Sequence, residues 1–152
     1  MKRELLKDAY QILAGIPPRR FIRGLDFVAE HRNENDWSSI LKPCGALACG
    51  IGWLALYPGK PFERIGIDAS FDLTLDDKGP ISYTEAAGNF FDIPERVAND
   101  LFGPRDHHWD LPAYDREPGV KRLSDKRLLL YRIRRVLGQS PKDALYGARR
   151  DG

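Results

Sequence analysis

The chain has little cysteine and almost no net charge. Its 152 residues include two cysteines, too few for a disulfide scaffold, so we expect both to be thiols in a reducing compartment. Its 24 lysines and arginines nearly balance its 22 aspartates and glutamates, which leaves a net charge of +2. This balance excludes a uniformly basic nucleic-acid-binding protein but permits a local basic patch.

Long apolar segments are also missing. The basic residues near the N-terminus are followed by no long apolar run, which argues against a signal peptide. The longest uncharged stretch, residues 43–59, contains four glycines and is a poor membrane span. We therefore expect a cytoplasmic protein that does not contact a membrane.

Known catalytic signatures are absent from the sequence. It contains no glycine-rich phosphate-binding loop, no metalloprotease helix motif and no hydrolase nucleophile elbow. Internal repeats and low-complexity segments are missing as well. These absences favour a non-enzymatic protein without a cofactor.

What is present predicts an α-rich α+β fold in one domain, residues 1–146, with a frayed tail at 147–152. Hydrophobic residues make up 42% of the chain and charged residues 30%, which is typical of globular proteins. Apolar periodicity predicts four main helices, and alternating apolar and polar residues predict one β-hairpin over residues 71–83. The helices are expected at 4–16, at 125–137, and as two helices joined by a tight turn within 84–102.

The four helices are expected to surround a buried central helix over residues 46–57. This segment is apolar on nearly all sides, as helices in a protein core are. Gly45, Gly50 and Gly52 lower its intrinsic helix propensity, and we expect them to allow close approach by neighbouring elements.

The residues from Cys44 to Gly52 resemble a signature of small proteins from bacteria and their phages, Cys-Gly-Thr-x-x-Cys-x-x-Gly. In that group a leading helix and a Pro-x-x-x-Phe segment precede the signature, similar to Pro17–Phe21, and an apolar pattern similar to Ala87–Phe102 follows it. The resemblance covers roughly half of the chain, with Ala46 in place of the threonine. It implies a small, mostly helical phage or mobile-element protein, and it supplies no function or site residue.

Three interpretations of the two cysteines remain open. Cys49 fits a small core residue and Cys44 a residue near a helix cap. The second interpretation is a zinc site formed by Cys44, Cys49, His107 and His108, although this spacing departs from common zinc motifs. The third is a thiol enzyme in which Cys44 is the nucleophile and His107 or His108 the base.

The leading functional hypothesis is an interaction protein that binds a host protein or a second copy of itself. The long segment 103–123 carries His107, His108 and Trp109, and such segments in compact domains are often functional. The helix over 125–137 is expected to display its basic residues on the outside. Predicted contact residues are His107, His108, Trp109, Arg127, Arg134 and Arg135.

The alternative is a nucleic-acid-binding regulator. It would use the helix-turn-helix-like segment 84–102 or the basic helix 125–137. The second helix of the first segment carries Arg96 but also Glu95 and Asp100, which suits phosphate contact poorly.

Overall fold

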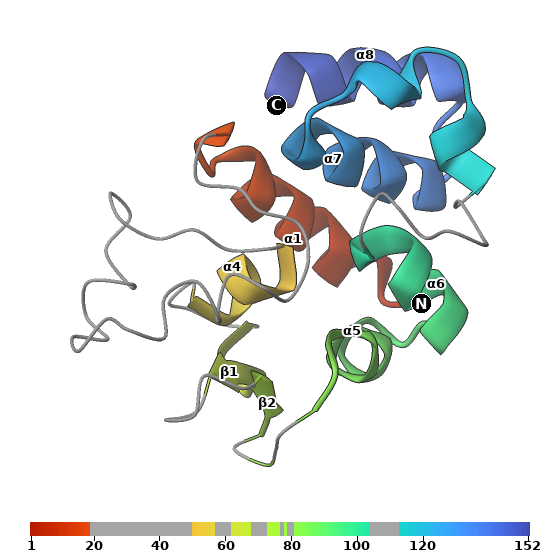
Figure 1. Cartoon of the computed structure of the whole chain (residues 1–152). Helices are drawn as coiled ribbons and strands as arrows, with labels where there is room; N and C mark the ends of the chain where they lie inside the picture. Colours follow the sequence, from red (N-terminus) through yellow and green to blue (C-terminus); the bar gives the residue numbers. More distant parts are fainter. Residues whose placement is uncertain (19–49, 57–61, 68–72, 77, 79–80, 104–112) are drawn as a thin grey trace.

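The residues that the structure describes are mostly helical and include one two-stranded antiparallel hairpin, which confirms the α-rich α+β class (Figure 1). The computed structural model describes residues 1–18, 50–56, 62–67, 73–76, 78, 81–103 and 113–152. Its elements are α1 (Arg3–Ala14), α4 (Gly50–Leu56), η2 (Phe62–Arg64), β1 (Ile65–Ile67), β2 (Leu73–Leu75), α5 (Tyr83–Phe91), α6 (Glu95–Phe102), η3 (Ala113–Arg116), η4 (Val120–Arg122), α7 (Asp125–Val136) and α8 (Pro141–Asp151).

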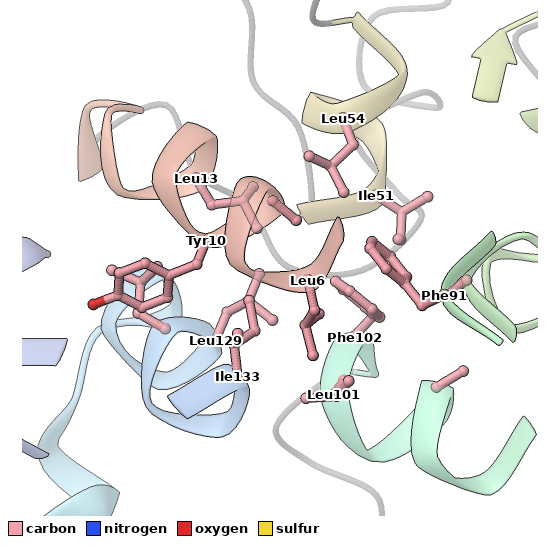
Figure 2. Packing of buried hydrophobic residues seen from close by; sticks show 14 of the residues in the cluster. Leu6, Tyr10, Leu13, Ile51, Leu54, Phe91, Leu101, Phe102, Leu129 and Ile133 are labelled. Carbon is pink, nitrogen blue, oxygen red and sulfur yellow. The ribbon is translucent and has the colours of Figure 1, made fainter. Parts of the chain in front are cut away.

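Helix α1 lies between the α7–α8 pair and the layer that holds α4 and the hairpin (Figure 1). Its buried residues Leu6, Ala9, Tyr10 and Leu13 share one face at helical spacing. This face packs against α4, α5 and α7, so α1 joins the two halves of the core. Figure 2 shows Leu6 and Leu13 directed into that core.

The described part of the predicted central helix, α4, is buried as expected. Ile51, Trp53 and Leu54 belong to the hydrophobic core. At Gly50 an added Cβ would lie 2.5 Å from Leu129 Cδ2 of α7 and 3.5 Å from Phe102 Cδ1 of α6. The missing side chain therefore lets α4 approach both helices, as predicted. Residues 46–49 and 57 lie outside the described residues.

The structure contains a hairpin, but the prediction for residues 71–83 named the wrong partner strand. The predicted first strand is β2, and its partner precedes it in the chain instead of following it. Strand β2 pairs with the preceding β1, with Ile65 opposite Leu75 and Ile67 opposite Leu73. The chain after β2 turns back through an isolated bridge, in which the backbones of Leu75 and Lys78 exchange two hydrogen bonds (3.0 Å each), and the Ile81 amide then donates to the Leu73 carbonyl (3.0 Å). It then enters α5, because the Ser82 hydroxyl accepts from the Glu85 amide (3.1 Å) and caps that helix.

Helices α5 and α6 form the predicted helix–turn–helix arrangement. Asp92 ends α5 with φ of 52°, and the Ile93 amide donates to the Gly88 carbonyl (3.1 Å). The Phe91 and Phe102 rings then stack across the turn with centroids 5.8 Å apart. Their apolar faces complete the core beneath α1 (Figure 2).

The predicted frayed tail is wrong, because α8 continues to Asp151. The Ser140 hydroxyl caps this helix by accepting from the Asp143 amide (3.2 Å), and Pro141 occupies its first turn. Gly147 and Ala148 are buried against α7. Packing of these small residues holds the last turns in place. None of the helices in the described ranges has the length and apolar character needed to cross a membrane.

Candidate partner-binding surface

Several residues singled out from the sequence lie outside the described residues. His107, His108 and Trp109 fall in 104–112, and Cys44 and Cys49 fall in 19–49. The predicted contact segment and the zinc and thiol hypotheses therefore stay predictions. Within the part of the chain that the structure describes, no three His, Cys, Asp or Glu side chains gather as metal ligands would.

The sequence predicts that the basic residues of α7 lie on its outer face, but two of them are buried. Arg132 is 0% exposed, and its Nε donates to Oδ1 of Asp115 at 2.8 Å while its Nη2 pairs with Oδ2. Its Nη1 donates to the carbonyl of Gly103 (2.9 Å). Lys126 is 4% exposed and donates to the Ala14 carbonyl (2.7 Å), and burial lowers its pKa. Both cations therefore serve the fold.

Arg135 is held by the segment that precedes α7. Its Nε lies 3.1 Å from both carboxylate oxygens of Glu117, and its Nη2 lies 2.9 Å from Oε1. Its Nη1 donates to the Gln139 carbonyl (2.6 Å). The guanidinium also lies over the ring of Tyr114, 5.2 Å from its centroid.

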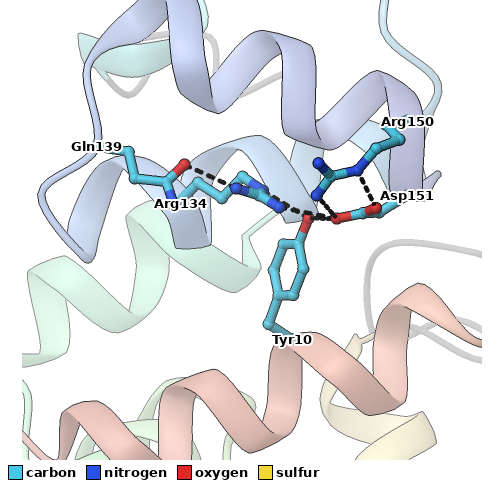
Figure 3. Close-up of polar contacts among 5 residues, drawn as sticks. All are labelled: Tyr10, Arg134, Gln139, Arg150 and Asp151. Carbon is cyan, nitrogen blue, oxygen red and sulfur yellow. Dashed lines mark hydrogen bonds and ion pairs between the residues drawn. The ribbon is translucent and has the colours of Figure 1, made fainter.

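Arg134 joins α7 to both α1 and α8 (Figure 3). Its Nε donates to the Tyr10 hydroxyl (2.5 Å), its Nη1 to Oε1 of Gln139 (2.8 Å) and its Nη2 to Oδ2 of Asp151 (2.8 Å). Tyr10 donates in turn to Asp151 (2.5 Å). A Cβ on Gly147 would overlap the Arg134 guanidinium, so this glycine lets α8 pass over it.

The network around Arg134 shifts the pKa values of Asp151 and Tyr10. The Arg150 guanidinium, 2.8 Å from Oδ1 of Asp151, is the main cause that lowers the pKa of that carboxyl, with Tyr10 and Arg134 contributing. Burial, together with the hydrogen bond to Asp151, raises the pKa of Tyr10 to about 12. Of the three arginines predicted as partner contacts, Arg134 and Arg135 are thus engaged within the fold, and Arg127 is exposed.

These inward pairs leave the outside of residues 113–152 strongly basic. The segment contains 11 lysines and arginines and 5 aspartates and glutamates, a charge of +6, whereas 13 basic and 17 acidic residues give residues 1–112 a charge of −4. Three of the 5 carboxylates, on Asp115, Glu117 and Asp151, pair with Arg132, Arg135 and Arg134. This charge asymmetry was visible in the sequence but is hidden in the total of +2.

The basic surface, as we define it, lies on η3, η4 and α8. All of its members are exposed: Arg116, Lys121, Arg122, Lys142, Tyr146, Arg149 and Arg150. Tyr146 is 68% exposed, and the Arg150 guanidinium lies 5.8 Å from its ring centroid. Lys142 and Arg149 lie within about one turn of it on the outer face of α8. The surface therefore combines positive charge with one accessible aromatic ring.

A pocket of about 480 Å³ lies within this surface, where the turn between η3 and η4 meets α8. Its charged lining consists of Arg116, Glu117, Lys121, Arg122 and Arg149. A second pocket of about 280 Å³, beside α1 and α7, contains Lys7 and Arg134, but both are already paired, with Glu4 and Asp151. The first pocket is therefore the better candidate for a ligand.

Helix α6 is poorly suited to contact nucleic acid. Its exposed residues Glu95 and Arg96 have opposite charges, and the half-buried Asp100 adds a negative charge on the next turn. Because phosphate binding depends on an excess of cations, this helix would gain little from a phosphate backbone.

Comparisons with known proteins add no identification. A scan against protein-family models found no match, and searches of curated proteins and of solved structures found no similar protein.

Proposed function

We propose that the protein is a non-enzymatic interaction protein that binds an acidic region of a partner protein through its basic surface. The observation that carries the proposal is the separation of charges in residues 113–152. Arg132, Arg134 and Arg135 pair with carboxylates inside the fold and Lys126 is buried, whereas the cations of the basic surface are exposed. Such a surface attracts partners of opposite charge and accelerates their association.

Tyr146 favours binding to a protein over binding by charge alone. Tyrosine and arginine are enriched among the residues that dominate binding energy at protein interfaces. A tyrosine that is 68% exposed on a helix, with an arginine over its ring, has this character. The proposal contains no catalytic step, because the described residues of the surface offer cations and one ring but no paired nucleophile and base.

The partner is expected in a bacterial cell, because the Cys44–Gly52 signature resembles proteins of bacteria and phages. Nucleic acid is the alternative partner of the same surface. His107, His108 and Trp109 precede this surface in the sequence and remain predicted contact residues.

The test compares two charge-reversed proteins as bait in nuclease-treated bacterial lysate. Arg116→Glu/Arg122→Glu/Arg149→Glu removes the basic surface, and Arg96→Glu makes the same change at an exposed position on α6. We expect proteins retained by the wild type to be lost with the triple variant and kept with Arg96→Glu. Equal retention by all three baits would refute the proposal.

Two further arms use the same proteins. Fluorescence anisotropy with duplex and single-stranded DNA tests the alternative, which predicts binding that weakens steeply with salt. Retention that disappears on nuclease treatment would assign the surface to nucleic acid. Arg127→Glu tests the exposed arginine of α7 that the sequence had singled out.

A further inference from the structure

We infer that the pocket bounded by Arg116, Lys121, Arg122 and Arg149 binds a phosphate monoester on the partner protein. The inference rests on the proposed function, since it names the group that the basic surface recognises. Arginine-rich pockets are a recurrent way of recognising phosphorylated side chains.

The pocket is built by a tight turn that is pressed against α8. Gly119 adopts φ of 84° between η3 and η4, a conformation that favours glycine. A Cβ at this position would lie 3.0 Å from Leu145 Cδ2 and 3.5 Å from Arg149 Nη2. The next residue, Val120, is buried in the core and anchors the turn. The turn thus places cations of η3 and η4 beside the Arg149 guanidinium.

The three arginines of the pocket have no carboxylate partner among the residues that the structure describes. Among the described residues that line the pocket, Glu117 is the one carboxylate, and its two oxygens accept from Arg135, which lies outside the pocket. In the part of the chain that the structure describes, Arg116, Arg122 and Arg149 have no carboxylate at ion-pair distance. Like charges that line one pocket repel one another, so an anion bound there stabilises the fold as well.

The ligand chemistry follows from the number and type of these cations. A carboxylate brings one negative charge, whereas a phosphate monoester brings about −1.5 to −2 at pH 7 and three acceptor oxygens. Three of the four cations are arginines, whose planar donor forks match phosphate oxygens in pairs. A volume of about 480 Å³ admits the phosphate together with the side chain that carries it.

The experiment titrates the protein with three pentapeptides that place phosphoserine, serine or glutamate between glycines. Calorimetry measures affinity, and amide chemical shifts of Gly119 and Val120 report the position of binding. We expect the phosphoserine peptide to bind roughly tenfold more tightly than the glutamate peptide, the difference made by about one charge-assisted hydrogen bond.

Arg122→Ala/Arg149→Ala should weaken phosphoserine binding by a factor of about 100, since each arginine contributes about tenfold. Arg96→Ala is the matched control and should leave it unchanged. Because both pocket arginines are exposed, circular dichroism should show a folded double variant. Arg122→Lys/Arg149→Lys keeps the charge and removes the forks, and should give an intermediate affinity.

Equal affinity for the phosphoserine and glutamate peptides, or no effect of the double variant, would overturn the inference. If lysate proteins still depend on the basic surface in that case, the proposed function survives and the phosphate assignment alone fails. Tighter binding of a 5′-phosphorylated oligonucleotide than of the phosphoserine peptide would overturn the assignment to a protein partner. Loss of all surface-dependent protein capture would remove the proposed function itself.

Discussion

Arg132→Met should be among the most destabilising substitutions in the protein, because it leaves a buried carboxylate without a partner. Asp115 is 6% exposed and receives two of the arginine's hydrogen bonds. Nη1 of Arg132 also donates to the carbonyls of Gly103 (2.9 Å) and Leu101 (3.3 Å). Removing one partner of such a pair costs about 3–5 kcal/mol. This corresponds to a decrease in Tm of roughly 6–20 °C for a chain of this size.

Urea unfolding followed by circular dichroism measures the free energy of unfolding. Arg127→Met is the matched control, because this arginine is exposed on the same helix, and it should change stability by less than about 0.5 kcal/mol. The double variant Arg132→Met/Asp115→Leu removes the lone carboxylate and should recover about 1 kcal/mol or more relative to Arg132→Met. The two backbone carbonyls still lack their donor, so recovery should be incomplete.

A loss of less than 1 kcal/mol in Arg132→Met would refute the reasoning. It would mean that Asp115 reaches water or another donor when the arginine is absent. A double variant less stable than Arg132→Met would likewise show that the lone carboxylate is not what destabilises the single variant.

The remaining predictions concern the contact between α1, α7 and α8. Asp151→Asn should cost about 1–2 kcal/mol at pH 7, measured by urea unfolding, because it weakens bonds from Tyr10, Arg134 and Arg150. Since folding lowers the pKa of Asp151, its contribution to the free energy of unfolding is present above the unfolded pKa of about 3.9 and is lost as the pH falls. The stabilities of the wild type and Asp151→Asn should therefore converge in acid, and a difference that persists there would contradict this. Folding raises the pKa of Tyr10 from its ordinary value of 10.0 to about 12, so the contribution of Tyr10 to stability is complete below pH 10 and is lost as the pH rises toward 12. The Tm of Tyr10→Phe should therefore fall less over that range than the Tm of the wild type. Gly147→Ala should destabilise by about 1–3 kcal/mol because its methyl group would overlap Arg134, whereas Gly15→Ala, where the nearest atom is the Ile12 carbonyl oxygen at 3.4 Å, should be tolerated in the same thermal assay.

Local patterns in the sequence were sufficient for most helices. Ser124 caps α7 by accepting from the Arg127 amide (3.3 Å), and the buried face of α1 follows helical spacing. The close approach at Gly50 could also be anticipated, because an apolar helix with glycines must lie in a crowded environment.

Features that depend on distant partners could not be predicted. Helical periodicity treats arginine as a surface residue, and nothing near Arg132 indicates that Asp115 will meet it from an irregular segment. The last turn of α8 depends on Tyr10, 141 residues earlier in the chain. Strand β1 has three residues with Gly66 in the middle, so it shows no usable alternation.

Only part of the candidate surface could be predicted from the sequence. The sequence predicts a basic surface on α7, but the cations that form the pocket lie on η3, η4 and α8. Charge counted by segment indicates them, whereas the pairing of Arg134 and Arg135 with carboxylates within the fold becomes visible only in the structure.

The most direct test of the central claim, that the outward cations of residues 113–152 bind an acidic protein, is site-specific photo-crosslinking at position 146. A photoreactive phenylalanine replaces Tyr146 in the wild type and in Arg122→Glu/Arg149→Glu, and adducts from nuclease-treated lysate are mapped by mass spectrometry. We predict adducts to acidic protein segments in the wild-type background and their loss in the charge-reversed one. Adducts of equal yield in both backgrounds, or adducts to nucleic acid when nuclease is omitted and none to protein, would contradict the account.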